Sequence, residues 1–169
     1  TARLRPGALK GAVEAPMPGR IEPQLATAVP DPPEGEQWLH EIKFDGYRTL
    51  AHLEAGKVAL VTRAGLDWTK RYGNLPRAFE ALPCKSALID GEIVVPDESG
   101  IARFAALQEA LSSGAGNRLV YYAFDLLYLD GWDLRAVPIE KRKDLLAQLL
   151  GGRVEASTAI QFSDHVVGD

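Results

Sequence analysis

The sequence predicts an α+β domain built mainly from antiparallel sheets with flanking helices. Segments with the alternation of strands and segments with helical spacing follow one another without strict strand–helix–strand order. Two-residue turn signals, Ala55-Gly56 and Asp130-Gly131, adjoin predicted strands, as is typical of hairpins. Hairpins join antiparallel strands, so these signals favour an antiparallel sheet over a doubly wound parallel one.

The pattern of apolar residues then predicts each element in turn. Alternation or continuous apolar runs predict strands at 38–42, 46–54, 57–63, 86–96 and 119–130. Helical spacing predicts helices at 74–82, 104–111 and 138–150. Pro76 lies in the first turn of the first of these helices, and Gly151-Gly152 ends the last one.

The chain divides into two regions by composition. Residues 1–36 contain seven of the eleven prolines, so we expect an extended approach segment outside the core. Its first twenty residues are basic, since Arg3, Arg5, Lys10 and Arg20 oppose only Glu14. This basic segment would either contact a phosphate backbone or serve as a linker. Residues 37–169 are expected to form the N-terminal part of a globular domain.

The composition excludes several classes of protein. The 169 residues suit one domain of ordinary size, and 46% hydrophobic with 25% charged residues argues against disordered and fibrous chains. The sequence has no apolar run of about 18 residues, the length that spans a bilayer. Cys84 is the only cysteine, which excludes an internal disulfide and favours a cytoplasmic compartment. A net charge of −4 means that nucleic acid would need a local basic surface.

The segment 41–48 carries the strongest chemical signal, Lys43-x-Asp45-Gly46-x-Arg48. Asp-Gly tolerates the left-handed backbone region, so we expect a turn that brings Arg48 back on the next strand. Lysine becomes a nucleophile where desolvation or a neighbouring cation lowers its pKa, and Arg48 is such a cation. Arginine also grips phosphate well. The motif suits covalent chemistry on a nucleotide phosphate; a solvated lysine and arginine beside a turn is the alternative.

Three further clusters bear on this chemistry. Arg63 ends a predicted strand, in reach of a ribose or phosphate, although a surface arginine is the default alternative. Asp90-Gly91-Glu92 interrupts an apolar strand, which requires a metal, a ribose hydroxyl, an arginine partner or a bulge that turns both carboxylates to solvent. The aromatic segment 121–128 offers ring faces for purine stacking, or simply core. Because the sequence lacks a glycine-rich phosphate loop, strand side chains would hold any nucleotide.

The order of these motifs resembles nucleotidyltransferase motifs I, Ia, III and IIIa of ATP-dependent DNA ligases. Several short sequence segments are also similar to those of the ligase domain of bacterial DNA ligase D, an end-joining enzyme that works with the Ku protein. The segments that carry this resemblance are 38–48, Phe104-Ala105-Ala106-Leu107-Gln108 and 124–131. The likeness extends over about residues 20 to 169.

The resemblance implies a role for each site residue. Lys43 would attack the α-phosphate of ATP and hold AMP, which then passes to a DNA 5′-phosphate for strand joining in double-strand break repair. Glu41 and the backbone of Ile42 would read the adenine edge, and Phe124 would stack on it. Arg48 and Arg63 would hold ribose and phosphate groups, with Arg63 also meeting the DNA 5′-phosphate. Glu92 would bind the ribose or lie near a divalent metal, Mg²⁺ or Mn²⁺.

The resemblance also implies partners: nicked or broken double-stranded DNA, Ku, and linked polymerase and nuclease domains, in the bacterial cytoplasm at the nucleoid and with no membrane. A complete ligase continues into a Glu-Gly motif, a motif with two lysines and an OB-fold domain. The chain is therefore expected to lack those parts, and to be weakly active or inactive alone. The alternatives are an RNA ligase, an mRNA capping nucleotidyltransferase, or a non-catalytic binding or folding unit.

Overall fold

The structure is a computed structural model, which describes residues 4–151 and 159–168. Arg3, which belongs to the basic segment, and Gly152, expected to help end the last helix, lie outside these residues. The helices are α1 (Leu75–Glu80), α2 (Phe104–Ser113) and α3 (Ile139–Leu150), with 3-10 turns at Pro6–Ala8 and Gly116–Arg118. The strands are β1 (Val13–Glu14), β2 (Leu39–Glu41), β3 (Tyr47–Glu54), β4 (Lys57–Thr62), β5 (Ser86–Val94), β6 (Val120–Leu129), β7 (Trp132–Asp133), β8 (Ile160–Phe162) and β9 (His165–Val167).

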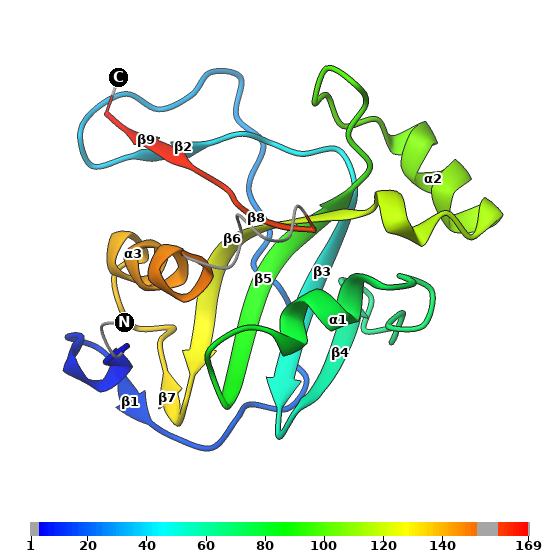
Figure 1. Ribbon diagram of the computed structural model, residues 1–169. Helices are drawn as coiled ribbons and strands as arrows, with labels where there is room; N and C mark the ends of the chain where they lie inside the picture. Colours follow the sequence, from blue (N-terminus) through cyan, green and yellow to red (C-terminus); the bar gives the residue numbers. More distant parts are fainter. Residues whose placement is uncertain (1–3, 152–158, 169) are drawn as a thin grey trace.

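Within the described residues, the strands form two sheets (Figure 1). The large sheet has the order β1-β7-β6-β5-β3-β4, and β8 pairs with β6. Its neighbours are antiparallel apart from the parallel pair β6–β8. The small sheet contains β2 and β9, also antiparallel. This confirms the predicted α+β class with antiparallel sheets, although the short strands β1, β7, β8 and β9 were not foreseen.

The two predicted turns have the backbone that a two-residue hairpin requires. Ala55 and Gly56, between β3 and β4, have φ angles of 50° and 76°. Asp130 and Gly131, between β6 and β7, have φ angles of 44° and 95°. Positive φ at both central positions twists the turn in the sense that matches the strands. The second turn therefore leads into a return strand, β7, rather than simply ending β6.

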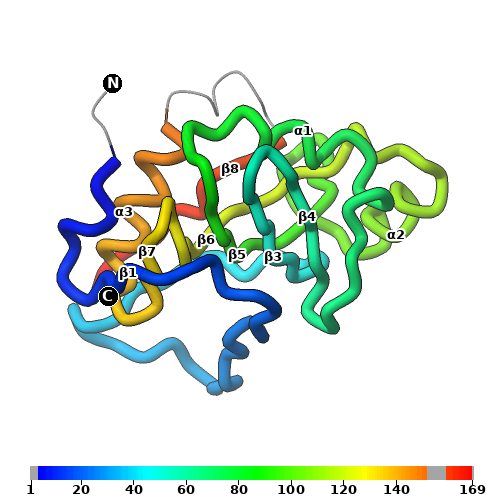
Figure 2. The backbone as a smooth tube through the Cα atoms, turned by 90° about the horizontal axis from the view of Figure 1, so that it is seen from below, coloured from blue at the N-terminus to red at the C-terminus, as the bar shows by residue number. Residues whose placement is uncertain are grey.

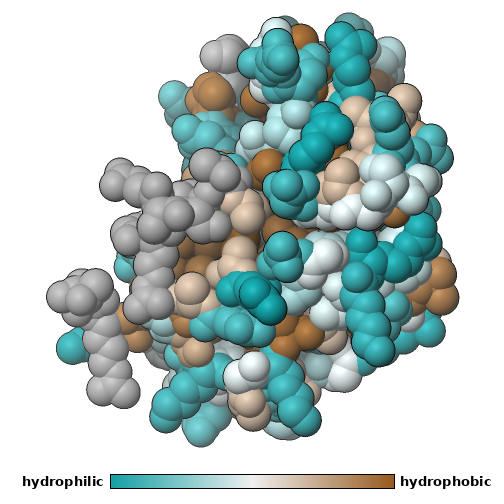
Figure 3. Space-filling view, turned by 45° about the vertical axis from the view of Figure 1, so that its right-hand side comes forward, coloured by the Kyte–Doolittle hydropathy of each residue, from teal (hydrophilic) through white to brown (hydrophobic). Residues whose placement is uncertain are grey.

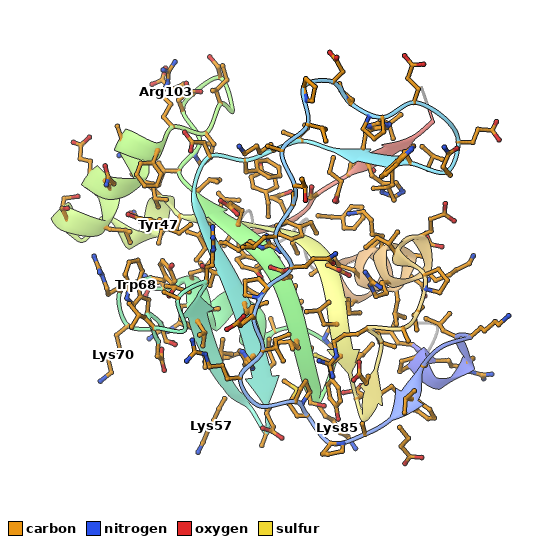
Figure 4. The ribbon with its side chains drawn as sticks, turned by 180° about the vertical axis from the view of Figure 1, so that it is seen from behind. Tyr47, Lys57, Trp68, Lys70, Lys85 and Arg103 are labelled. Atoms are coloured by element: carbon orange, nitrogen blue, oxygen red, sulfur yellow. The ribbon has the colours of Figure 1, made fainter. Side chains whose placement is uncertain are left out.

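The large sheet is covered on both faces. One face carries the main core, where side chains of α1, α2 and α3 join those of β3, β4, β5 and β6. On the other face, Met17 and Ile21 pack against Leu50, Leu88 and Tyr128. The segment that contains Met17 and Ile21 runs across this face, opposite α1 (Figures 2 and 4).

The N-terminal region is thus more integrated than the sequence suggested. Strand β1 pairs with β7, and Leu4, Leu9 and Ala12 pack against the main core. The Tyr128 hydroxyl also donates a hydrogen bond to the Ala15 carbonyl at 2.8 Å. The expectation that residues 1–36 lie outside the core is therefore wrong for these contacts. Proline content signalled extended backbone correctly, but extended backbone can still pack.

No helix among the described residues is long and apolar enough to cross a membrane. In the space-filling view, hydrophilic side chains occupy much of the surface, with smaller hydrophobic areas between them (Figure 3).

Aromatic packing supports the edge of the sheet near α2. There the rings of Tyr47 and Trp68 meet edge to face, with centroids 5.4 Å apart (Figure 4).

Candidate active site

A pocket of about 580 Å³ lies on the sheet face that the N-terminal segment covers. It brings together three of the predicted site residues, Glu41, Arg48 and Phe124. Its size is within the range of small-molecule sites. The full lining is Ile21, Glu22, Gln24, Leu25, Ala26, Glu41, Arg48, Asp90, Phe124, Asp125, Leu127, Arg135, Ile139 and Arg142.

Arg48 and Asp90 form a two-point ion pair at this pocket. Arg48 Nε donates to Asp90 Oδ1 at 2.8 Å and Nη2 donates to Oδ2 at 2.6 Å. Burial raises the pKa of the Asp90 carboxyl, which Arg48 opposes, and the hydrogen bond from Arg48 to Asp90 raises the pKa of the guanidinium. The guanidinium carbon lies 4.9 Å from the centre of the Phe124 ring. The sequence left open how a carboxylate could lie in this apolar strand, and for Asp90 the answer is an arginine partner. Strand β5 does have register shifts against β6, but they do not turn Asp90 to solvent, because the residue is buried.

Glu92 lies two residues further along β5, on the same side of the strand as Asp90. Burial raises its pKa to about 7, opposed by the charge of Arg48 and a hydrogen bond from the Gly46 backbone. The carboxyl group is therefore next to the turn that follows Lys43. It is not among the residues that line the pocket.

The turn after Lys43 differs from the prediction in two respects. Strands β2 and β3 belong to different sheets, so Arg48 does not return beside Lys43 on a paired strand. Gly46 has no positive φ; it is needed because a Cβ would collide with the Ile93 carbonyl oxygen. Residues 42–46 therefore link the small sheet to the large one.

Lys43 and Ile42 are both exposed, and Ile42 retains 74% of its accessible surface. Among the residues that the structure describes, Lys43 makes no hydrogen bond or ion pair. Arg48, the cation expected beside it, is paired with Asp90, so its charge is largely balanced. Neither Ile42 nor Lys43 lines the pocket, whereas their neighbour Glu41 does.

Arg63 is placed next to Arg48 by the main chain. Its backbone N–H donates to the Arg48 carbonyl at 3.2 Å, across the β3–β4 hairpin. The residue is exposed and does not line the pocket. The turn after it is held by Arg20, whose Nη2 donates to the Ala64 carbonyl at 3.2 Å. The N-terminal segment therefore reaches both the pocket and the Arg63 turn.

Sequence reasoning missed two basic residues of α3 that reach the site. Arg142 pairs with Asp125, with Nε to Oδ1 at 2.8 Å and Nη2 to Oδ2 at 3.1 Å. Lys143 is fully buried and donates to Glu41. A signal was available, because Ile139, Lys143 and Leu146 fall at helical spacing on the apolar side of α3. A charge on an apolar stripe predicts a buried partner.

Most of the aromatic faces considered for purine stacking are occupied. Tyr121 is buried and donates its hydroxyl to the carbonyls of Thr49 and Ile89. Phe44 stacks on Tyr122, with centroids 4.1 Å apart and planes 15° apart. Phe124 lines the pocket and is the ring of this segment that meets the site directly.

The described residues contain no group of three histidine, cysteine, aspartate or glutamate side chains that could hold a metal ion. They therefore do not fit a metal site built from protein ligands alone. Mg²⁺ bound to a nucleotide usually needs one or two carboxylates besides the phosphates. Glu92 fits that smaller requirement, since Asp90 is held by Arg48.

Chemically, the site combines an exposed primary amine, paired arginines and a pocket with an aromatic wall. An exposed amine can reach a bound electrophile, and arginine side chains bind anionic groups. The arrangement therefore suits binding of an anionic, aromatic ligand at Arg48 and Phe124, with an exposed lysine two residues after Glu41 of the pocket.

Comparison with known proteins identifies the family. A family model described as "ATP dependent DNA ligase domain" matches residues 23–169. The chain is 46% identical over 160 residues to the multifunctional non-homologous end joining protein LigD of Pseudomonas aeruginosa, covering 95% of this chain and 19% of that protein. It is 40% identical over 136 residues to the corresponding LigD of Mycobacterium tuberculosis (strain H37Rv), covering 80% and 17%.

Solved structures agree with this likeness. The ligase domain of M. tuberculosis LigD is 34% identical with a TM-score of 0.64, over 78% of this chain and 41% of that chain. A mycobacterial DNA ligase D complexed with ATP and MES is 31% identical with a TM-score of 0.60, over 78% and 40%. The chain spans less than half of these solved ligases and about a fifth of the curated relatives. Its fold matches the LigD ligase domain, and the chain belongs to the family of ATP-dependent DNA ligase domains.

Proposed function

We propose that this chain provides the attacking lysine and part of the nucleotide pocket of an ATP-dependent DNA ligase. The observation that carries the proposal is the pocket in which Glu41, Arg48 and Phe124 of the ligase motifs converge, with Lys43 two residues after Glu41 in the chain. Family membership supports ATP as the substrate, and a related solved ligase is complexed with ATP.

In this proposal the Nζ of Lys43, as a neutral amine, forms a bond to the α-phosphorus of ATP. The bond from that phosphorus to the bridging oxygen breaks, and pyrophosphate leaves with the electron pair. The amine proton passes to solvent, which leaves AMP on Lys43 as a phosphoramidate. The 5′-phosphate of a DNA strand then displaces Lys43, and a 3′-hydroxyl displaces AMP to seal the strand.

The surrounding residues would hold the nucleotide. Phe124 would stack on adenine, and Glu41 with the Ile42 backbone would read its edge. Arg48 and Arg63 would bind ribose and phosphate oxygens, and Arg63 would also meet the DNA 5′-phosphate. Arg48 is already oriented by Asp90, so it would bind the nucleotide without first losing rotamer freedom.

Glu92 would accept a ribose hydroxyl or contact Mg²⁺ or Mn²⁺ carried by the nucleotide. Such an ion, when bound, neutralises charge on the phosphates as pyrophosphate leaves. At the cellular level we propose nicked or broken duplex DNA as the substrate. Ku and linked polymerase and nuclease domains would be partners, in the bacterial cytoplasm near the nucleoid.

The test is transfer of label from α-labelled ATP. The chain, and a version extended to the length of the related ligase domains, are incubated with Mg²⁺ and either labelled ATP or labelled GTP. We expect acid-stable label from ATP. Lys43→Ala and Lys43→Arg should both abolish it, since a guanidinium stays protonated. Lys57→Ala, at the exposed β3–β4 turn (Figure 4), is the control and should label normally.

Three results would contradict the proposal. Label from GTP rather than ATP would indicate a capping nucleotidyltransferase, and label that persists in Lys43→Ala would place the nucleophile elsewhere. Folded protein that takes up no label even when extended would favour a non-catalytic binding unit.

A further inference from the structure

Helix α3 contains a lysine whose environment differs sharply from that of its neighbours. The side chain of Lys143 is 0% exposed, whereas that of Lys141, two residues earlier, is 59% exposed. Removing an ammonium group from water is expensive unless it is paired and hydrogen-bonded. The contacts of Lys143 therefore identify the groups that stabilise its buried charge.

The three hydrogens of the Lys143 ammonium have three acceptors. One is the Glu41 carboxylate, and the others are the main-chain carbonyls of Phe124 at 3.0 Å and Ser163 at 3.1 Å. The Phe162 ring centre lies 5.0 Å from the ammonium nitrogen. These residues belong to β2, to β6, to β8 and to the link between β8 and β9, all of which Figure 1 shows near α3.

These contacts connect separate parts of the proposed machinery. Glu41 ends β2, two residues before Lys43, and Phe124 is the aromatic wall of the pocket. Ser163 lies just before β9, the strand that pairs with β2. In the described residues β2 has three residues and pairs with β9 alone, and so short a ribbon is not stable by itself. Its position relative to the pocket therefore needs an anchor.

We propose that Lys143 is a positioning residue for adenylation: by binding Glu41, Phe124 and Ser163 together, it fixes the end of β2, two residues before Lys43, relative to the nucleotide pocket. This inference rests on the proposed function and assigns a further residue to that same site. Lys143 touches neither nucleotide nor reacting atoms; it acts through Glu41.

Stability alone does not explain a lysine at this position. Replacing a buried ion pair with apolar residues is often neutral or stabilising. The stripe of α3 that contains Lys143 is otherwise apolar, with Ile139, Leu146 and Leu150 at helical spacing. A residue that positions reacting groups should affect the rate of the chemical step more than nucleotide binding. Misplacing reacting groups by about 1 Å can lower the reaction rate about 100-fold.

The test compares Lys143→Met with Lys141→Met in the extended protein used above. We expect Lys143→Met to lower the kcat of self-adenylation by about 10- to 100-fold, with little change in the KM for ATP. Lys141→Met, which removes an exposed charge, should leave both unchanged. If Lys143→Met does not fold, Lys143→Gln replaces it, because its neutral amide can still donate to a main-chain carbonyl but no longer offers Glu41 a charge-assisted bond.

Two readouts separate positioning from general destabilisation. The double variant Lys143→Met with Glu41→Gln should have the same kcat as Lys143→Met, because both changes break the same contact, while lost adenine contacts of Glu41 would change only the KM. Acylation of Lys43 by acetic anhydride, mapped by mass spectrometry, should change in rate in Lys143→Met but not in Lys141→Met. This second readout does not depend on ATP.

Equal adenylation kinetics and equal Lys43 acylation in Lys143→Met and Lys141→Met would overturn the inference. A rise in KM with an unchanged kcat would also overturn it, since that pattern marks a binding residue. If the parent protein forms no AMP adduct, the proposed function fails, and the acylation rates alone then decide whether Lys143 positions Lys43.

Discussion

At the scale of single residues, the site depends on how buried charges are paired. Asp90 is 3% exposed and its carboxylate is bound by Arg48 through two hydrogen bonds. The sequence made Asp90 conspicuous, because a carboxylate in an apolar strand needs a partner. It did not show which partner, since Arg48 lies 42 residues away and meets Asp90 only when β3 pairs with β5.

Breaking this pair should be costly. Arg48→Ala leaves the Asp90 charge buried and unpaired, so we expect the free energy of unfolding to fall by about 3–5 kcal/mol in urea denaturation. The matched control is Arg103→Ala, which breaks the exposed pair with Asp97 and should lower the free energy of unfolding far less than Arg48→Ala does. Similar losses in the two variants would show that the Arg48–Asp90 pair is not an important buried contact.

Glu92 should titrate near neutrality, because burial raises its pKa from 4.5 to about 7. Between pH 4.5 and about 7, Glu92 keeps its proton in the folded protein and has lost it in the unfolded chain. The stability that this group contributes is therefore full below pH 4.5, and it is lost as the pH rises through about 7. Glu92→Gln should flatten this part of the stability–pH curve, while Glu98→Gln, in an exposed turn, should not. An unchanged slope in Glu92→Gln would contradict the assignment.

At the scale of elements, the long strands and helices could be predicted from the sequence because each has its own period of apolar residues. Strands β1, β7, β8 and β9 have two or three residues, too few for a pattern, and they form because a neighbouring strand offers hydrogen-bond partners. The partner of β2 was also beyond prediction. An Asp-Gly pair suggested a turn back to β3, whereas the chain crosses to another sheet.

The sequence correctly marked Gly46 as a position that needs glycine, but the reason is close packing rather than left-handed backbone. Its φ is not positive, yet a Cβ there would meet the Ile93 carbonyl and the Val94 side chain. Gly46→Ala should therefore lower stability by about 1–3 kcal/mol through overpacking between β3 and β5. Gly19→Ala is the control, because nothing lies within 4 Å of a Cβ at that position. Equal melting temperatures for the two variants would contradict this explanation.

At the scale of the whole molecule, the site is assembled from segments that are distant in sequence. The N-terminal segment, β2, β5, β6 and α3 all contribute to one pocket. The ligase motifs could be recognised from short segments of the sequence and from their order along the chain. The structure brings three residues of these segments, Glu41, Arg48 and Phe124, together at the pocket. Lys143 stands out on the apolar side of α3, but neither it nor Arg142 belongs to a ligase motif, and only the packing of α3 against β6 brings them to the site.

The extent of the chain leads to a prediction about rate. It spans 41% of the solved M. tuberculosis ligase domain, and the resemblance places further phosphate-binding groups in the remainder. We therefore expect the extended protein to self-adenylate at least about 10²–10³ times faster than the 169-residue chain, the loss that one missing electrostatic donor causes. Comparable rates in the two proteins would show that this chain is catalytically sufficient.

The central claim is that Lys43 carries AMP, and the most direct measurement is the site of the adduct. The extended protein is incubated with ATP and Mg²⁺, digested, and its peptides are sequenced by mass spectrometry. We expect AMP on the peptide that contains Lys43, at that lysine and at no other, with loss of the adduct when pyrophosphate is added. AMP on a different residue, or an adduct of equal yield in Lys43→Ala, would contradict the account.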